Sequence, residues 1–203
     1  MNLFQKIGAI VTKPKEFFSQ VKQEKGIGPA FGYYAVVSLM FTILGMLMAV
    51  LTTSMMMGLF GMMSRSMWMY WSGMAITPIF IIFMGIFGYI VKLIGSFIYA
   101  GILHLWILIF GGKAEYTETY KLAVYAQTPK LLLGWIPFVS FIIWIWDILL
   151  LIIGTQAVHG VSRTKAIWMY IIPVILLIGF LLLFLIFFGL AMTSAGMMAN
   201  MMG

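Results

Sequence analysis

Three charged side chains lie inside apolar segments of this chain, and their types and positions make them the first candidates for chemistry. They are Lys92, Lys130 and Asp147, and Asp147 is the only acid within an apolar segment. A charge in the bilayer interior costs at least ~2.5–3.5 kcal/mol on insertion scales, so it must be paired, hydrated or neutralised. The three residues therefore predict either the polar interior of a transporter or channel subunit, or an ion pair that fixes the packing of helices.

Methionines gathered at two places in the sequence form a second candidate site. Thioether sulfurs are soft ligands that suit Cu(I), so these residues could form a copper site on the outer face of a membrane. Apart from this ion, no cofactor is expected. The alternative is that methionine serves as an adaptable apolar filler. The residues assigned to the metal site are Met55, Met56, Met57, Met62, Met63, Met197, Met198, Met201 and Met202.

Other kinds of chemistry find no support in the sequence. Cysteine is absent, which excludes disulfides and thiolate metal sites. His104 and His159 have no second histidine or carboxylate at ligand spacing, so neither predicts a zinc or catalytic site. Since no nucleophile–base pair or carboxylate dyad is visible, we predict a protein that is not an enzyme.

Four apolar blocks must position these residues, and each is long enough to cross a hydrocarbon core of ~30 Å. The chain is 64% hydrophobic and only 8% charged, which leaves no room for a second, soluble domain of any size. The sequence predicts an all-α, polytopic transmembrane helical bundle, with a cytoplasmic amphipathic segment (1–28) and a transmembrane domain (29–203). The blocks run from about Ala30 to Thr53, Ile76 to Phe110, Leu131 to Val158 and Ala166 to Met192.

The second block, 76–110, is longer than one span requires, and we favour one long helix over two spans. This gives five spans in total, or six if the block is divided. The stretch 55–73, rich in Met and Gly, is expected to be a loop. A helix over 117–134, a turn and a returning arm form a helical hairpin, which brings Lys130 and Asp147 to one depth and predicts an ion pair between them.

The first 28 residues predict two short amphipathic helices, separated at Thr12-Lys13-Pro14, with the proline in the first turn of the second helix. Such helices either lie in the headgroup region, where anionic lipids attract their lysines, or pack on their own membrane domain.

The positive charges predict the orientation. Nine of the twelve Lys and Arg residues fall in 1–28, 113–121 and 159–165, whereas the two outer loops and the C-terminus of a five-span topology hold only Arg65. By the positive-inside rule the N-terminus is cytoplasmic and the C-terminus outside, in the plasma membrane. The net charge of +7 is therefore explained by the orientation of the chain in the membrane, and no nucleic acid partner is expected.

Several segments resemble the Yip1-domain family, in the family's order and over nearly the whole chain. They are Thr12–Phe18 (TKPKEFF), Gly111–Thr117 (GGKAEYT), Tyr125–Pro129 (YAQTP), Ile143–Gly154, and Val158–Ala166 (VHGVSRTKA).

The resemblance implies five spans with a cytoplasmic N-terminus and an outside C-terminus. Eukaryotic members act in vesicle traffic and contact small GTPases of the Rab type, but their DLYGP segment is absent here, so the chain looks like a prokaryotic-type member. We therefore expect a membrane-organising or trafficking-related protein, with the lipid bilayer and anionic lipids as partners and a homo-oligomer as a further option. The alternatives are the transporter or channel subunit and the soft-metal protein.

Overall fold

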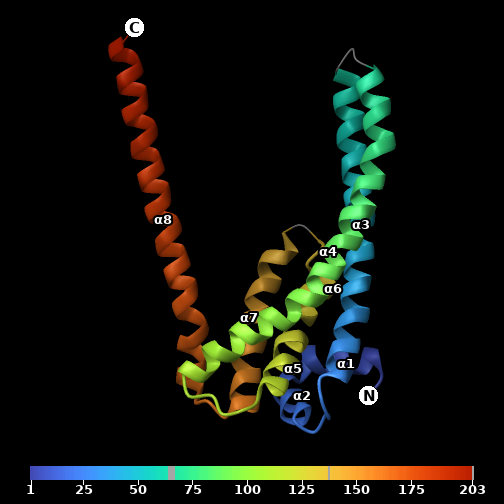
Figure 1. The fold of residues 1–203 in the computed structure, drawn as a ribbon, viewed down its shortest axis with the longest axis vertical. Coiled ribbons are helices and arrows are strands. Elements are labelled where there is room, and N and C mark those ends of the chain that lie inside the picture. Colours follow the sequence, from blue (N-terminus) through green and yellow to red (C-terminus); the bar gives the residue numbers. More distant parts are fainter. Residues whose placement is uncertain (64–66, 137, 203) are drawn as a thin grey trace. The chain divides into compact units, whose positions relative to one another are not determined.

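The computed structural model is helical throughout most of the residues that it describes, which are 1–63, 67–136 and 138–202. Side chains are described for these residues except 57, 60–63, 67–76, 191 and 194–202. The helices divide between two compact units, 1–161 and 162–203, and the second unit consists of α8. In chain order the helices are α1 (Leu3–Thr12), α2 (Pro14–Val21), α3 (Gly28–Met63), α4 (Met67–Ile109), α5 (Tyr116–Ala126), α6 (Thr128–Leu133), α7 (Val139–His159) and α8 (Arg163–Met202) (Figure 1).

Four of the described helices are long and apolar enough to cross a bilayer, which confirms the prediction of a polytopic helical protein. Three belong to the first unit and one is α8. The predicted block 76–110 lies within the single helix α4, so the interpretation as one helix is correct. The apolar segments are Gly28–Met56, Thr77–Ile109, Val139–His159 and Arg163–Leu190.

The stretch rich in Met and Gly is mostly helical, so the prediction of a loop over 55–73 is wrong. α3 continues to Met63 and α4 begins at Met67, and the two helices run side by side to this end (Figure 1). Methionine is a good helix former, and an isolated glycine costs only about 1 kcal/mol. Since no proline lies between Pro29 and Pro78, nothing in this stretch forces either helix to end early.

The predicted hairpin forms, but its first arm consists of two helices rather than one. α5 and α6 occupy the predicted helix 117–134, and both pack on α7. Pro129 has no N–H to donate to the carbonyl of Tyr125. The hydroxyl of Thr128 donates to that carbonyl instead, at 2.7 Å. At the break between α5 and α6, this side-chain hydrogen bond thus takes the place of the backbone hydrogen bond that Pro129 cannot form.

The core of the first unit lies where α2, α5 and α7 meet. Every residue of α5 from Thr119 to Ala126 is buried. Gly154 in α7 allows the close approach of these helices, because a Cβ atom there would lie only 2.2 Å from Cδ1 of Leu122. Small residues serve this purpose at many helix contacts within membranes. The N-terminal helices are thus tied to the hairpin that carries Lys130 and Asp147.

Candidate functional site

The two N-terminal helices pack on the rest of the first unit through one apolar face. Phe17 and Phe18 of α2 are buried, and α2 contacts α7 and α5. The ring of Phe17 meets the ring of Tyr125 edge to face, with centroids 5.0 Å apart. Ile10 is the buried residue of α1. We call α1 and α2 together the N-terminal platform.

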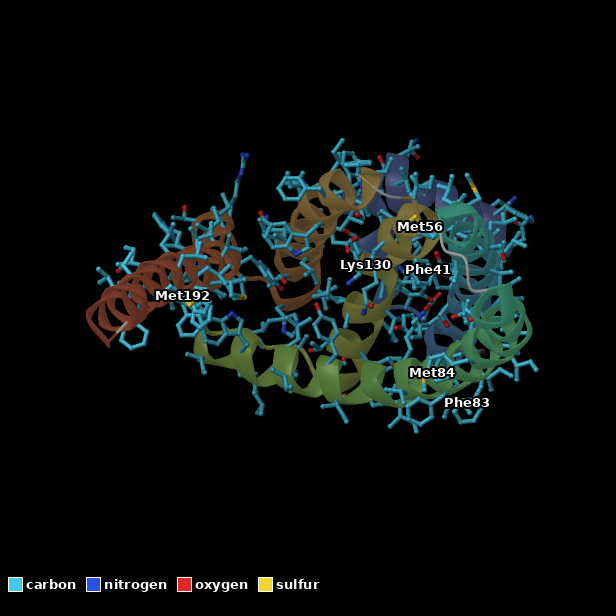
Figure 2. The ribbon with its side chains drawn as sticks, turned by 90° about the horizontal axis from the view of Figure 1, so that it is seen from above. Phe41, Met56, Phe83, Met84, Lys130 and Met192 are labelled. Carbon is cyan, nitrogen blue, oxygen red and sulfur yellow. The ribbon has the colours of Figure 1, made fainter. Side chains whose placement is uncertain are left out.

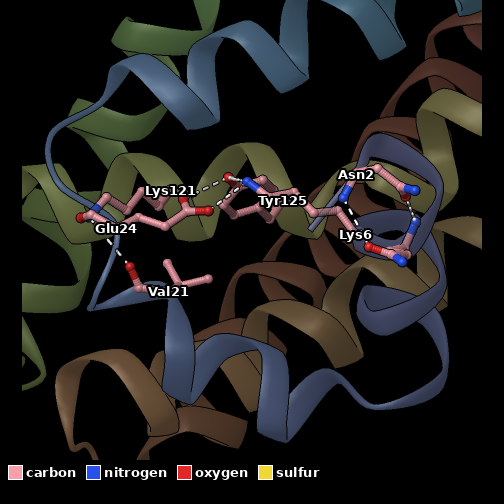
Figure 3. Close-up of polar contacts among 7 residues, drawn as sticks. Asn2, Lys6, Val21, Glu24, Lys121 and Tyr125 are labelled. Carbon is pink, nitrogen blue, oxygen red and sulfur yellow. Dashed lines mark hydrogen bonds and ion pairs between the residues drawn. The ribbon is translucent and has the colours of Figure 1, made fainter.

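A closed polar cluster holds the platform on α5 (Figure 3). The ammonium of Lys6 lies 2.5 Å from Oε1 of Glu24. The hydroxyl of Tyr125 donates to Oε2 of Glu24 at 2.8 Å and accepts from the ammonium of Lys6 at 2.9 Å. Charge-assisted hydrogen bonds of this kind are about twice as strong as neutral ones. One carboxylate therefore joins the end of the N-terminal segment to both α1 and α5.

Lys121 adds a second connection. Its side chain is only 1% exposed, and its ammonium donates to the backbone carbonyl of Glu24 at 2.5 Å. Glu118, one turn earlier in α5, lies 3.8 Å away. The sequence alone places Lys121 among the charges of a polar cytoplasmic segment and does not indicate this contact. The spacing of Glu118 and Lys121 could have predicted only their own pair, because side chains three residues apart are neighbours on a helix. It carries no signal for the contact with Glu24, which is 97 residues away.

The opposite side of the platform is exposed. Phe4 is 75% exposed and Val11 is also exposed; seven residues separate them, which is about two turns, so they share one side of α1. That side lies about 120° around the helix from the buried Ile10. A capping box fixes the first turn, because the Asn2 side chain accepts from the backbone N–H of Gln5 and the Gln5 side chain accepts from that of Asn2. The exposed lysines of the segment are Lys13, Lys15, Lys22 and Lys25.

The structure brings two of the three predicted intramembrane charges to one cavity. Lys130 and Asp147 line a cavity of about 290 Å³ together with Tyr99, Gln127 and Trp144. The predicted ion pair is wrong as a direct contact, because none of the ion pairs of the described residues joins these two side chains. Their separation follows from the interrupted arm, since Lys130 belongs to the short helix α6 and not to a continuous helix facing α7.

Lys92, the third predicted charge, lies in a different place. It lines a groove of about 400 Å³ between α3 and α4. Its ammonium is 3.3 Å from the hydroxyl of Thr42 and 4.3 Å from the centre of the Phe41 ring. A hydroxyl and an aromatic face are both favourable neighbours for a cation. Lys92 therefore does not share the cavity of Lys130 and Asp147.

His104 and His159, which the sequence left without partners, are joined through Thr119. The hydroxyl oxygen of Thr119 lies 2.8 Å from Nδ1 of His104 and 3.0 Å from Nε2 of His159. The backbone N–H of Ala114 donates to Nδ1 of His159, so a neutral His159 carries its proton on Nε2 and donates to Thr119. This chain ties α4, α5 and α7 together. No group of three or more metal-ligating His or acidic residues occurs in the described part of the chain.

The predicted copper site lies mostly outside the described side chains, so it stays a prediction. Met55 and Met56 are described, and both are exposed on α3. The remaining members fall outside the described side chains; they are Met57, Met62, Met63, Met197, Met198, Met201 and Met202.

Comparison with known proteins gives one match. The family model described as Yip1 domain matches residues 8–186 of the chain. No curated protein and no solved structure matches. The match covers the end of α1 from residue 8, all of α2, the hairpin and much of α8, and it includes all five segments on which the resemblance was based.

Proposed function

The chain belongs to the Yip1 domain family, and from this premise we propose that it is a non-enzymatic, membrane-organising protein of the plasma membrane. Its N-terminal platform rests on the inner leaflet and couples that leaflet to the transmembrane helices. The observation that carries the proposal is the division of the platform into two sides. One side is fixed to the bundle by Phe17, Phe18 and the cluster around Glu24. The other exposes Phe4 and Val11 of α1, and the same N-terminal segment carries four exposed lysines.

Elementary energetics support a lipid surface as the partner of the exposed side. Aromatic and aliphatic side chains insert shallowly at the boundary of headgroups and acyl chains. Each nearby Lys gains about 1 kcal/mol at an anionic surface. An amphipathic helix on a flexible tether inserts independently of its protein, whereas the platform is bonded to α5 through Lys6 and Lys121. Insertion would therefore change the lipid packing around the bundle itself, which is what a membrane-organising protein requires.

This proposal predicts where a polarity-sensitive dye meets lipid. In full-length protein reconstituted in vesicles with anionic lipid, a dye on Phe4→Cys or Val11→Cys should shift to shorter wavelength. Glu16 forms an exposed ion pair with Lys13, so a dye on Glu16→Cys is the matched control. Its emission should stay at the wavelength found in water. Added salt should reduce the shift, since the attraction of lysines to the surface is screened. Identical spectra at positions 4, 11 and 16 would contradict the proposal.

The orientation can be tested separately with single cysteines, because the natural chain has none. We expect a membrane-impermeant maleimide to label Ser194→Cys on intact cells and to label Ser19→Cys only after permeabilisation. The reason is the concentration of nine Lys and Arg residues in segments assigned to the inside. Labelling of Ser194→Cys only after permeabilisation would reverse the orientation.

A further inference from the structure

The cavity shared by Lys130 and Asp147 contains a buried acceptor that the protein leaves unused. Asp147 is 8% exposed, and its Oδ1 atom is buried with no hydrogen-bond partner among the described residues. An unpaired buried polar atom costs about 1–3 kcal/mol, and more when it is charged. A group with an N–H or O–H donor placed in this cavity would remove that cost.

The opposite charge lines the same cavity without reaching Asp147. Lys130 is exposed and belongs to no ion pair of the described residues, so a bound group can reach its ammonium. It lies within the arc of α7, α4 and α3, whereas Phe83 projects outward from α4 (Figure 2). A simple cation in the cavity would be attracted by the carboxylate of Asp147 but repelled by the ammonium of Lys130. A simple anion would be attracted by Lys130 but repelled by Asp147. A neutral ligand would leave both charges without a charged partner.

We propose that this cavity binds a small zwitterion, with a primary or secondary ammonium hydrogen-bonded to Asp147 and a phosphate or carboxylate bonded to Lys130. Such a ligand satisfies both charges at once. Tyr99 and Gln127 add polar side chains to the lining, and Trp144, Ile148 and Leu151 supply apolar surface for its carbon atoms.

The size of the cavity limits the ligand. A volume of about 290 Å³ is at the lower end of the ~300–1,000 Å³ found for small-molecule sites, so it suits a headgroup or an amino acid rather than a larger metabolite. Lys130 is within one turn of the end of α6, and Asp147 lies eight residues into α7, about 12 Å from its start. The cavity is therefore close to the turn of the hairpin, where either a phosphoethanolamine lipid headgroup or a free amino acid could enter.

The test uses purified full-length protein in a detergent without zwitterions. Binding of phosphatidylethanolamine, phosphatidylcholine and phosphatidylglycerol is measured by native mass spectrometry. Free phosphoethanolamine and alanine are tested by thermal shift. Phosphatidylcholine has no N–H donor and phosphatidylglycerol has no ammonium, so both should bind more weakly than the zwitterion with a donor. If only the lipid binds, the ligand is a lipid headgroup. If only the free compounds stabilise the protein, the ligand is a soluble molecule.

Two variants and one control decide the outcome. Asp147→Asn and Lys130→Gln should each weaken binding about tenfold or more, as expected for loss of a charge-assisted hydrogen bond. Lys15→Gln, which removes an exposed lysine of α2 that does not line this cavity, should bind like the natural protein. If Asp147→Asn does not fold, Lys130→Gln alone gives the answer. The proposal is overturned if no zwitterion binds the folded natural protein, or if folded Lys130→Gln binds as tightly. Since the assay does not depend on the platform or on orientation, its failure leaves the proposed function unaffected.

Discussion

Replacement of Glu24 by alanine should release the N-terminal platform from the bundle. The carboxylate accepts from both the ammonium of Lys6 and the hydroxyl of Tyr125, and the Tyr125 side chain is fully buried. Without it, a partly buried ammonium loses its counter-charge. We expect a loss of roughly 2–4 kcal/mol, between the value of a charged hydrogen bond and that of breaking a buried ion pair. Hydrogen exchange of the α1 and α2 amides and trypsin cleavage after the platform lysines would measure the release.

The exposed ion pair of the same segment provides a matched control. Lys13 and Glu16 are 3.9 Å apart, with side chains 68% and 69% exposed. Pairs of this kind contribute at most about 1 kcal/mol, so Glu16→Ala should leave exchange almost unchanged. The Lys6→Ala/Glu24→Ala double variant should lose less than the sum of the single losses. Equal exchange in Glu24→Ala and Glu16→Ala would show that apolar packing alone holds the platform.

The second large effect is expected at Gly154, where valine should force α7 away from α5 and α2. A Cβ atom would lie 2.2 Å from Cδ1 of Leu122 and 3.3 Å from two ring atoms of Phe18. Leu122 and Phe18 are both fully buried, so neither has free space to enter. Overpacking of this kind costs about 1–3 kcal/mol. The apparent melting temperature of the full chain in detergent should fall accordingly.

Two further variants separate steric conflict from a general effect of valine in a membrane helix. Gly95→Val in α4 should be tolerated, because a Cβ atom there meets nothing within 4 Å. Leu122→Ala combined with Gly154→Val removes the atom in conflict, so the double variant should lose less stability than the sum of the two single losses. If the double variant were less stable than the sum of its parts predicts, the clash would not be the cause.

The long apolar elements could be predicted from the sequence because an uncharged apolar run of about 20 residues matches the thickness of a bilayer and is rare in proteins that fold in water. The break at Gln127 was harder to predict. Pro129 was a visible signal, but prolines occur inside continuous membrane helices as well, as Pro78 does in α4. The loop at 55–73 was predicted from composition, yet Met and Gly do not end helices unless another element requires it.

The candidate site, too, could be predicted from the sequence only in part. The sequence identified Lys130 and Asp147 as neighbours because both belong to one hairpin, which the shared cavity confirms. It could not show that the two side chains form no direct ion pair, because the expected register assumed one continuous helix and the arm is interrupted before α6. The cluster of Lys6, Glu24 and Tyr125 joins positions about a hundred residues apart, and a single sequence contains no local pattern for such a contact.

The apolar segments within the first unit differ greatly in length. At 1.5 Å per residue, Gly28–Met56 is ~44 Å long and Thr77–Ile109 is ~50 Å, whereas Val139–His159 is only ~32 Å. A bilayer that matches α7 leaves α3 and α4 too long, and they must either tilt or draw the surrounding lipid into a thicker layer. Each ångström of mismatch costs a fraction of a kcal/mol, which is enough to sort proteins among membranes. The protein should therefore partition toward thicker bilayers and create a step in thickness between its long helix pair and its short hairpin.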